Sequence, residues 1–124
     1  MALDTLSKFY YGHDVSLDNN KLGFDEGGGE LTAELRIGEL TLTEYANEIA
    51  LAMNDAGSLS YSVSLDRETR KITISANGSF DLLVSSMSAT GQSTFPLAGF
   101  EGGDLIGAST YTGQNGSGRE FRPQ

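Results

Sequence analysis

The sequence contains no cysteine and no tryptophan, only two prolines and a single histidine. The absence of cysteine excludes disulfides, thiolate zinc sites and a cysteine nucleophile. One histidine is too few for a metal site built on imidazole ligands. Basic residues are also scarce, 8 against 17 acidic ones, which gives a formal net charge of −9. Such a chain is repelled by phosphate backbones and anionic lipid, so we expect neither nucleic acid nor membrane as a partner.

Long apolar runs are missing as well, and no stretch of the sequence is long enough to cross a membrane as a helix. Residues 1–14 do not combine a basic region with an apolar run, so we expect no secretory signal. Glycine, by contrast, is abundant at 16 of 124 residues. This is nearly twice its average usage, and with so little proline it predicts many tight turns between short strands.

The two ends of the chain differ from its middle. Residues 1–30 carry apolar side chains without a regular period, and residues 25–30 include three consecutive glycines, which predict a loop. After Phe100 the composition shifts to glycine, serine, threonine and asparagine. We therefore predict a single domain spanning residues 1–124, with extended arms at about residues 1–20 and 105–124 that gain order against a neighbouring subunit.

The middle of the chain predicts one strand followed by one helix. Apolar and polar residues alternate over residues 31–37, the pattern of a half-buried strand, which Gly38 closes. Thr41 and Glu44 have the spacing of a capping box at a helix N-terminus. An apolar stripe at helical spacing follows, and Gly57 predicts a left-handed stop. The stripe consists of Leu42, Tyr45, Ala46, Ile49, Ala52 and Met53.

A β-hairpin is predicted next, because residues 59–65 and 72–76 both alternate with period two around a polar turn. Residues 77–79 predict a second turn and residues 80–84 a further strand. Residues 93–100 predict a single helical turn, capped by Ser93 or Thr94 and ended by Gly99. The fold class is therefore predicted to be α+β: mainly an antiparallel β-sheet or small sandwich, with one amphipathic helix around residues 42–56 packed on it.

Candidate catalytic groups are few. His13 is the only candidate for a catalytic base, and no Gly-x-Ser-x-Gly turn is present, so a histidine on the surface or at a strand end is the interpretation we prefer. Gly99, Gly102 and Gly103 do not open a helix after a strand and so predict no phosphate-binding loop. We expect no catalytic residue and no cofactor, and hence no enzyme.

The acidic residues near the N-terminus raise the question of calcium. Their spacing does not match a calcium loop, in which oxygen ligands alternate around a glycine, and a solvated acidic loop is the better interpretation. The residues concerned are Asp14, Asp18, Asn19, Asn20, Asp25, Glu26 and Glu30. We therefore expect no metal. Paired carboxylates for glycoside hydrolysis are a matter of spatial separation, which the sequence leaves open.

One stretch of the sequence, residues 30–111, resembles a module that recurs in tail and other virion proteins of double-stranded DNA bacteriophages. The resemblance lies in the order of its elements: a strand ending in Ile37-Gly38, a helix, a hairpin, Phe80-Asp81-Leu82-Leu83, and Pro96-Leu97-Ala98-Gly99-Phe100. The segments Phe9-Tyr10-Tyr11-Gly12 and Gly107-Ala108-Ser109-Thr110-Tyr111-Thr112-Gly113 also look similar to that group. Ala98 departs from the pattern, which usually has leucine there.

The resemblance implies a structural subunit of a phage virion, in a tail, baseplate or neck, assembled in the host cytoplasm and bound to copies of itself and to other virion proteins. An alternative is a module that binds a host receptor or surface glycan. Strand faces rich in serine and threonine favour that alternative, with Tyr10, Tyr11, Tyr61 and Tyr111 as possible stacking platforms.

Overall fold

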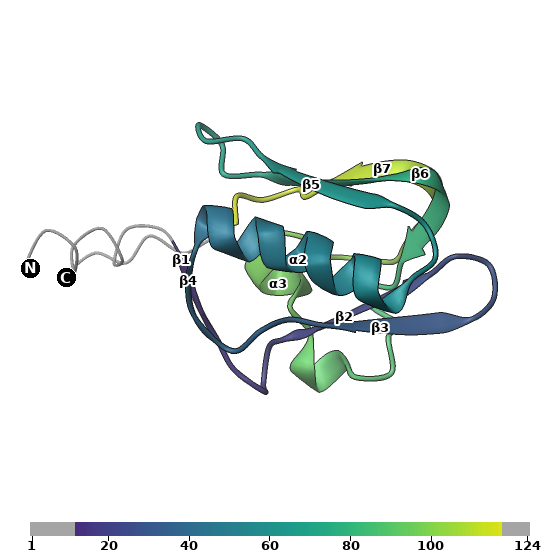
Figure 1. Cartoon of the computed structure of the whole chain (residues 1–124), viewed down its shortest axis with the longest axis horizontal. Helices are drawn as coiled ribbons and strands as arrows, with labels where there is room; N and C mark the ends of the chain where they lie inside the picture. Colours follow the sequence, from purple (N-terminus) through teal and green to yellow (C-terminus); the bar gives the residue numbers. More distant parts are fainter. Residues whose placement is uncertain (1–11, 118–124) are drawn as a thin grey trace, which may run out of the picture.

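The fold is α+β, as predicted. A computed structural model describes residues 12–117, which form two antiparallel sheets, one long helix and one short helix (Figure 1). The elements follow in the order β1 (Gly12–Val15), β2 (Lys21–Asp25), β3 (Glu30–Glu34), β4 (Gly38–Thr41), α2 (Leu42–Ala56), β5 (Tyr61–Leu65), β6 (Ile72–Leu82), the 3-10 turn η1 (Thr90–Gln92), α3 (Phe95–Ala98) and β7 (Leu105–Thr112).

The long strand β6 organises the larger sheet. The strand order is β3-β2-β6-β5, and β7 also pairs with β6, so that β6 contacts three other strands. In Figure 1, β5, β6 and β7 form an upper layer, β2 and β3 form a lower layer, and α2 lies between the two. The helix contacts both β5 and β3. The small sheet pairs β1 with β4 next to the start of α2.

A bulge in β6 allows this strand to pair with strands of both layers. The first half of β6 pairs with β5 over residues 72–76, and its last residues pair with β2 at Leu82 and Asp81. Between these halves the register with β7 shifts, since Ser75 lies opposite Thr110 and Phe80 opposite Ala108. The predicted turn at residues 77–79 is therefore wrong. The glycine-containing stretch is an irregularity within a continuous strand, of the kind that bends a strand and increases its twist.

The capping box of α2 is confirmed. The Thr41 hydroxyl accepts a hydrogen bond from the Glu44 N–H at 3.1 Å, and the Glu44 carboxylate accepts one from the Thr41 N–H at 2.9 Å. All six residues of the predicted apolar stripe are buried. The predicted left-handed stop is wrong, because Gly57 is extended, with φ −108°. Its lack of a side chain instead admits the Glu26 carboxylate, which a Cβ at this position would meet.

The N-terminal arm predicted for about residues 1–20 extends too far into the chain. Residues 12–15 form β1, and residues 1–11 lie outside the described range. Residues 21–25, within the stretch whose apolar side chains show no regular period, form a core strand, because β2 lies between β3 and β6. Leu22 and Phe24 are both fully buried on one face of β2. A Cβ on Gly23 between them would meet Met87, so the other face of the strand is covered as well. The strand predicted for 31–37 ends at Glu34, and Ile37 is exposed.

The C-terminal arm predicted from about residue 105 is corrected in the same way. Residues 105–112 form β7, and the following residues are tied to the domain by backbone bonds. The N–H of Gly113 donates to Ile72, that of Asn115 to Gly99 and that of Ser117 to Arg70. β7 is ordered because it lies along β6 and places Tyr111 against Phe80. Residues 118–124 are not described.

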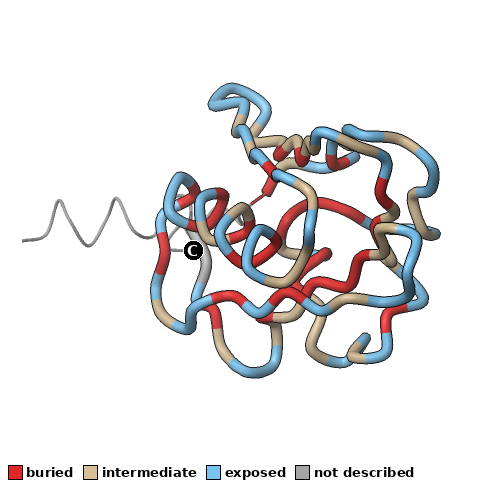
Figure 2. The backbone as a smooth tube through the Cα atoms, turned by 45° about the vertical axis from the view of Figure 1, so that its right-hand side comes forward, coloured by how far each residue is buried: buried red, intermediate tan, exposed pale blue. Residues whose placement is uncertain are grey.

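The core fills the space between the layers, where the buried segments in Figure 2 converge. Four aromatic rings cross it in edge-to-face contact, with centroid separations of 5.5 Å for Phe24–Tyr61, 5.2 Å for Tyr61–Phe80 and 5.1 Å for Phe80–Tyr111. A fifth ring, that of Tyr45, donates its hydroxyl to the Thr94 carbonyl at 3.1 Å. Among residues 12–117 no buried side-chain nitrogen or oxygen lacks a partner. The core therefore links all the main elements without a polar defect.

Candidate interaction surface

The acidic residues considered as calcium ligands do not converge. Within the described part of the chain, no group of three or more His, Asp or Glu side chains is placed to hold a metal ion. Asp14 and Asp18 are exposed. Asp25 accepts hydrogen bonds from the N–H groups of Gly27 and Gly29, at 2.7 and 3.2 Å, and so shapes the β2–β3 turn. His13 lies in β1 opposite Leu40.

Glu26 joins the β2–β3 turn to the chain that enters β5. Its carboxylate accepts hydrogen bonds from the Ser58 N–H at 2.9 Å and the Leu59 N–H at 3.0 Å. It also accepts one from the Tyr61 hydroxyl at 2.5 Å. Partial burial opposes ionisation, but these hydrogen bonds outweigh it and lower the pKa of Glu26 below its ordinary value. Burial, then the hydrogen bond and charge of Glu26, raise the pKa of Tyr61. The pair is therefore a structural contact between a carboxylate and a neutral phenol.

Two other carboxylates repeat this arrangement. Glu30 accepts the Ser88 hydroxyl at 2.6 Å and its N–H at 2.8 Å, and these hydrogen bonds lower the pKa of Glu30. Asp104 accepts the Ser86 hydroxyl at 2.5 Å and the N–H groups of Ser85 and Ser86, which lowers its pKa. Each of these carboxylates is held in its ionised form and attaches a loop. None has the raised pKa expected of a general acid.

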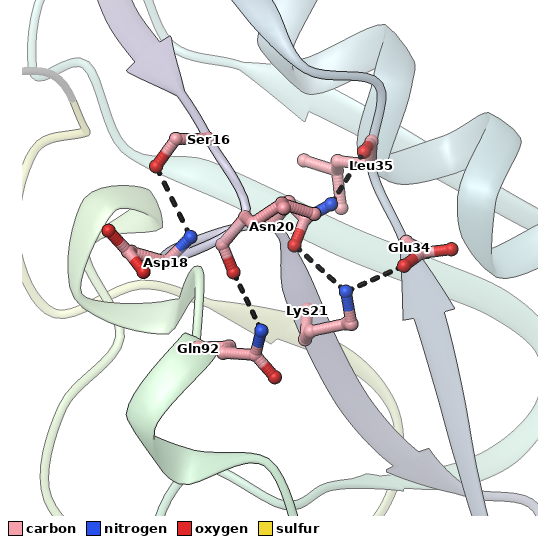
Figure 3. A network of polar contacts seen from close by, with 8 residues as sticks. Ser16, Asp18, Asn20, Lys21, Glu34, Leu35 and Gln92 are labelled. Atoms are coloured by element: carbon pink, nitrogen blue, oxygen red, sulfur yellow. Dashed lines mark hydrogen bonds and ion pairs between the residues drawn. The ribbon is translucent and has the colours of Figure 1, made fainter.

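The polar network in Figure 3 is also structural. Asn20 is buried, and its side-chain amide donates to the Leu35 carbonyl at 3.1 Å while its oxygen accepts from Lys21 at 3.0 Å. Lys21 forms an ion pair with Glu34 at 2.6 Å. Gln92 donates to the Leu17 carbonyl at 2.8 Å, which ties η1 to the β1–β2 connection. This network fixes the end of β3 and leaves Asn20 fully satisfied.

The outward face of β5, β6 and β7 carries an ordered array of hydroxyl groups. The strand register places these groups in two cross-strand rows, because directly paired residues project to the same face. The rows are Ser62–Ser75–Thr110 and Ser64–Thr73–Thr112. In both rows the β6 and β7 hydroxyls are hydrogen-bonded at 2.8 Å. The alternation in the sequence predicts wet faces, but only the register shows that three strands align them. We call these six residues the hydroxyl array.

Two of the tyrosines considered as stacking platforms do not lie on this face. Tyr61 is 6% exposed, and its ring packs between Phe24 and Phe80. The Tyr111 hydroxyl donates to the Phe80 carbonyl at 2.6 Å and accepts from the Ala108 N–H at 2.8 Å, so it fills a gap in the β6–β7 ladder. Tyr61 is therefore buried in the core, and the Tyr111 hydroxyl is bonded within β6 and β7. Tyr10 and Tyr11 lie outside the described residues.

The chain that enters β5 has its backbone groups occupied. Asn54, near the end of α2, accepts the Tyr61 N–H at 2.8 Å and donates to the Tyr61 carbonyl at 3.0 Å. The Ser60 N–H donates to the side chain of Asn77 at 3.0 Å, and Glu26 takes the two N–H groups before it. A side-chain amide thus bonds to β5 as a neighbouring strand would. Covering of this kind blocks edge-to-edge pairing at Tyr61, the first residue of β5.

The outer edge of β7 is open by comparison. The Gly113 N–H donates to the Ile72 carbonyl at 2.9 Å, so by the alternation of an antiparallel ladder the backbone groups of Thr110 and Thr112 point away from β6. Within residues 12–117 no strand pairs with that side of β7. The strand contains no charged residue, and Ile106 near its start is 71% exposed. An uncharged open edge is a template for pairing with another chain.

The acidic groups nearest to β7 are turned toward the protein itself. Asp81 accepts the Gly107 N–H at 2.9 Å, and Asp104 is held by Ser85 and Ser86 as described above. In a chain of net charge −9, β7 therefore carries no charge of its own, and the Asp81 carboxylate beside it is bonded to Gly107 near its start. Repulsion between copies of the protein is weakest where such a surface meets its equivalent.

A scan against protein-family models finds no match for the chain, and a search of the curated proteins finds none either. None of the helices in the described range is long and apolar enough to span a bilayer. The functional interpretation therefore depends on the geometry of β5, β6 and β7 and on the sequence resemblance.

Proposed function

We propose that the protein is a structural component of a bacteriophage virion, a tail, baseplate or neck subunit that acts through protein–protein contacts and not through catalysis. The observation that carries the proposal is the open, uncharged edge of β7 beside a β5 strand whose entry is covered. A monomeric protein usually protects a sheet edge with charge, proline or a covering segment. An edge without such protection suits a subunit whose strand pairs with a neighbour.

The sequence resemblance supports the same function. It covers residues 30–111, which in the fold run from the start of β3 to the end of β7. Two of its motifs lie where the fold constrains the backbone conformation or the packing of side chains. Gly99 ends α3 in the left-handed conformation, with φ 93°, and Phe95 and Phe100 pack together at 6.0 Å. The motif from Gly107 to Gly113 is β7 and its end.

The way the described carboxylates are used agrees with a role without catalysis. Glu26, Glu30 and Asp104 each accept hydrogen bonds from nearby backbone and hydroxyl groups, so their charges serve to attach loops. A subunit that must persist in an assembled particle benefits from loops fixed in this way, because fewer conformations are lost when neighbours dock.

The proposal is tested on purified particles of the phage that encodes the chain. Mass spectrometry of the virion proteins should detect the chain in a fixed stoichiometry, and an antibody against it should label one defined part of the particle in electron micrographs. Absence of the chain from purified virions, with ready detection in the infected-cell lysate, would refute a structural role.

The second candidate is a module that binds a host surface glycan, and the hydroxyl array favours it because six aligned hydroxyls offer donors and acceptors to a sugar. Glycan-array binding of the isolated protein tests this function. Saturable binding that is lost in S75A/T110A and kept in S58A would support it. No binding to any glycan would leave assembly as the only one of the two functions still supported.

A further inference from the structure

The open edge of β7 defines a specific self-association geometry. We propose that β7 pairs with β7 of a second copy in an antiparallel, twofold-symmetric arrangement centred on Tyr111, which joins the upper layers of the two copies, three strands each, into one continuous six-stranded layer. This inference rests on the proposed assembly function and names the segment that performs it. The occupant is a second copy of this chain because the edge is self-complementary in hydrogen bonding, side-chain size and charge.

The backbone pattern selects the centre of symmetry. Thr110 and Thr112 point their N–H and C=O groups away from β6, whereas Tyr111 points its own toward β6. A twofold axis at Tyr111 sets Thr110 of one copy opposite Thr112 of the other, and the reverse. Each of these pairs exchanges two hydrogen bonds, as directly opposed residues of a hydrogen-bonded pair do. Four backbone bonds then form, and every outward group of the regular stretch is used.

The side chains fit the same register. Thr110 and Thr112 belong to different rows of the hydroxyl array, so pairing them across the axis joins the first row of one copy to the second row of the other. Each joined row runs across six strands and contains only serine and threonine. Threonines opposed across an antiparallel pair are favourable neighbours. The contact contains no charged side chain, and its one bulky side chain, Tyr111, lies on the opposite face of the strand, where its ring packs against Phe80.

The bulge at the start of β7 limits the contact to this short stretch. Gly107 has φ 83°, and the Ala108 N–H is already bonded to the Tyr111 hydroxyl. A bulged strand cannot continue a regular ladder, so the paired segment ends before Ala108. Charge also favours this edge, because the strand itself carries none and the chain carries −9 overall. An isologous contact of this type closes on itself and gives a dimer, not a filament.

Cysteine cross-linking tests the register, and it has no background because the chain contains no cysteine. In the T110C/T112C variant each introduced thiol lies opposite the other position of the second copy. Cα atoms of a hydrogen-bonded antiparallel pair are about 5.5 Å apart, within the range for a disulfide. The variant should form a covalent dimer under mild oxidation and run at twice the mass of one chain on a non-reducing gel.

The matched control is S62C/S64C, which places two thiols on the same face and in the same two rows, but on β5 at the other side of the layer. It should remain largely monomeric under the same oxidation. Equal dimer yields for the two variants, or no dimer for T110C/T112C at any protein concentration that remains soluble, would overturn the proposed pairing.

A charge swap gives a second readout that does not depend on oxidation. T110K/T112K sets like charges opposite each other in both rows and should abolish concentration-dependent association in sedimentation velocity. T110K/T112E sets opposite charges in both rows and should restore it. S62K/S64K, with the same added charge on β5, should associate as the wild type does. Failure of T110K/T112E to restore association would contradict the register.

The outcomes separate this inference from the proposed function. If the chain is a component of purified virions but T110C/T112C does not cross-link, assembly uses another surface and only the pairing of β7 fails. If T110C/T112C forms the dimer but the chain is absent from virions, the pairing holds and the virion function fails.

Discussion

The two outer strands of the upper layer, β5 and β7, share the neighbour β6 but differ in the groups that bond to their outer edges. Both pair with β6, both lack charged residues, and both contribute to the hydroxyl array. The entry to β5 is bonded to Asn54 and Glu26, whereas the outward groups of β7 at Thr110 and Thr112 have no strand beside them within residues 12–117. Composition alone therefore does not determine whether an edge is available.

The difference arises from chain connectivity. β5 follows α2 directly, so the last turn of the helix brings Asn54 to the start of the strand, and the β2–β3 turn brings Glu26. β7 follows the irregular segment after α3, and the residues after it turn back toward α3 and the β5–β6 hairpin. Within residues 12–117 no side chain is hydrogen-bonded to the outward backbone groups of Thr110 or Thr112. The edges differ because of what precedes and follows each strand in sequence.

Phe80 connects the two edges, and its removal should have the largest effect. Its ring packs between Tyr61, at the covered side, and Tyr111, at the open side. Phe80→Ala deletes both contacts and leaves a cavity, so we expect a loss of about 3–5 kcal/mol in the free energy of unfolding. Urea denaturation followed by circular dichroism measures it. Val63→Ala, at a half-buried position of β5, should cost clearly less, and equal losses would contradict the central role of Phe80.

Gly99 should come next, because it controls how the chain returns to β7. Its backbone is left-handed, with φ 93°. The Asn115 N–H donates to the Gly99 carbonyl, and a Cβ on Gly99 would collide with the nearby Asn115 carbonyl. Gly99→Ala should cost about 1–3 kcal/mol from backbone strain, with the collision in addition. Gly91→Ala meets nothing within 4 Å and has no left-handed φ, so it should be close to neutral in the same urea titration. Similar effects of both would show that the segment adapts freely.

The extent to which sequence predicts these features differs between elements. The capping box and apolar stripe predict α2 fully, since helix signals are local. The β5–β6 hairpin follows from period-two alternation and is confirmed. The strand β2 is not predicted, because it is buried on both sides and its residues Leu22, Gly23 and Phe24 give no alternation. Burial on both faces depends on the segments that cover the sheet, here including Met87 over Gly23, and not on the strand itself.

The candidate surface was accessible from sequence only in part. Serine and threonine at alternate positions predict wet strand faces, but their alignment into rows depends on the register of three strands, and β7 was expected to be an arm. The rings of Tyr61 and Tyr111 pack against Phe80, and the sequence alone does not show which face of each strand is buried. Asn54 carries no signal of its role, since its partner Tyr61 is met only after the turn between α2 and β5.

Asn54→Ala would make the covered edge resemble the open one. It removes two hydrogen bonds to the Tyr61 backbone, at a cost of about 1–2 kcal/mol in the free energy of unfolding. In the S62C/S64C background the same substitution should also raise the yield of covalent dimer. Asn47→Ala, on the exposed side of α2, is the control for helix propensity. It should raise the free energy of unfolding by about 0.5 kcal/mol and leave the dimer yield unchanged. An unchanged dimer yield after Asn54→Ala would mean that something else keeps β5 unpaired.

Acid should weaken the covered edge, and this is the smallest effect we expect. Hydrogen bonds from Tyr61, Leu59 and Ser58 outweigh burial and hold the pKa of Glu26 below its ordinary 4.5. A carboxylate with a lowered folded-state pKa stabilises the fold fully above its unfolded pKa, and this contribution is lost as the pH falls through the folded value. Glu26→Gln should therefore lower the free energy of unfolding by about 1 kcal/mol at pH 7, and by less where solvent screens the group. The difference in this free energy from wild type should shrink below pH 4.

Urea titrations between pH 7 and pH 3 measure this difference, with Glu68→Gln in the exposed β5–β6 turn as the control. A difference that stays constant with pH would show that the charge of Glu26 plays no part in closing the entry to β5, so that shape alone distinguishes the two edges.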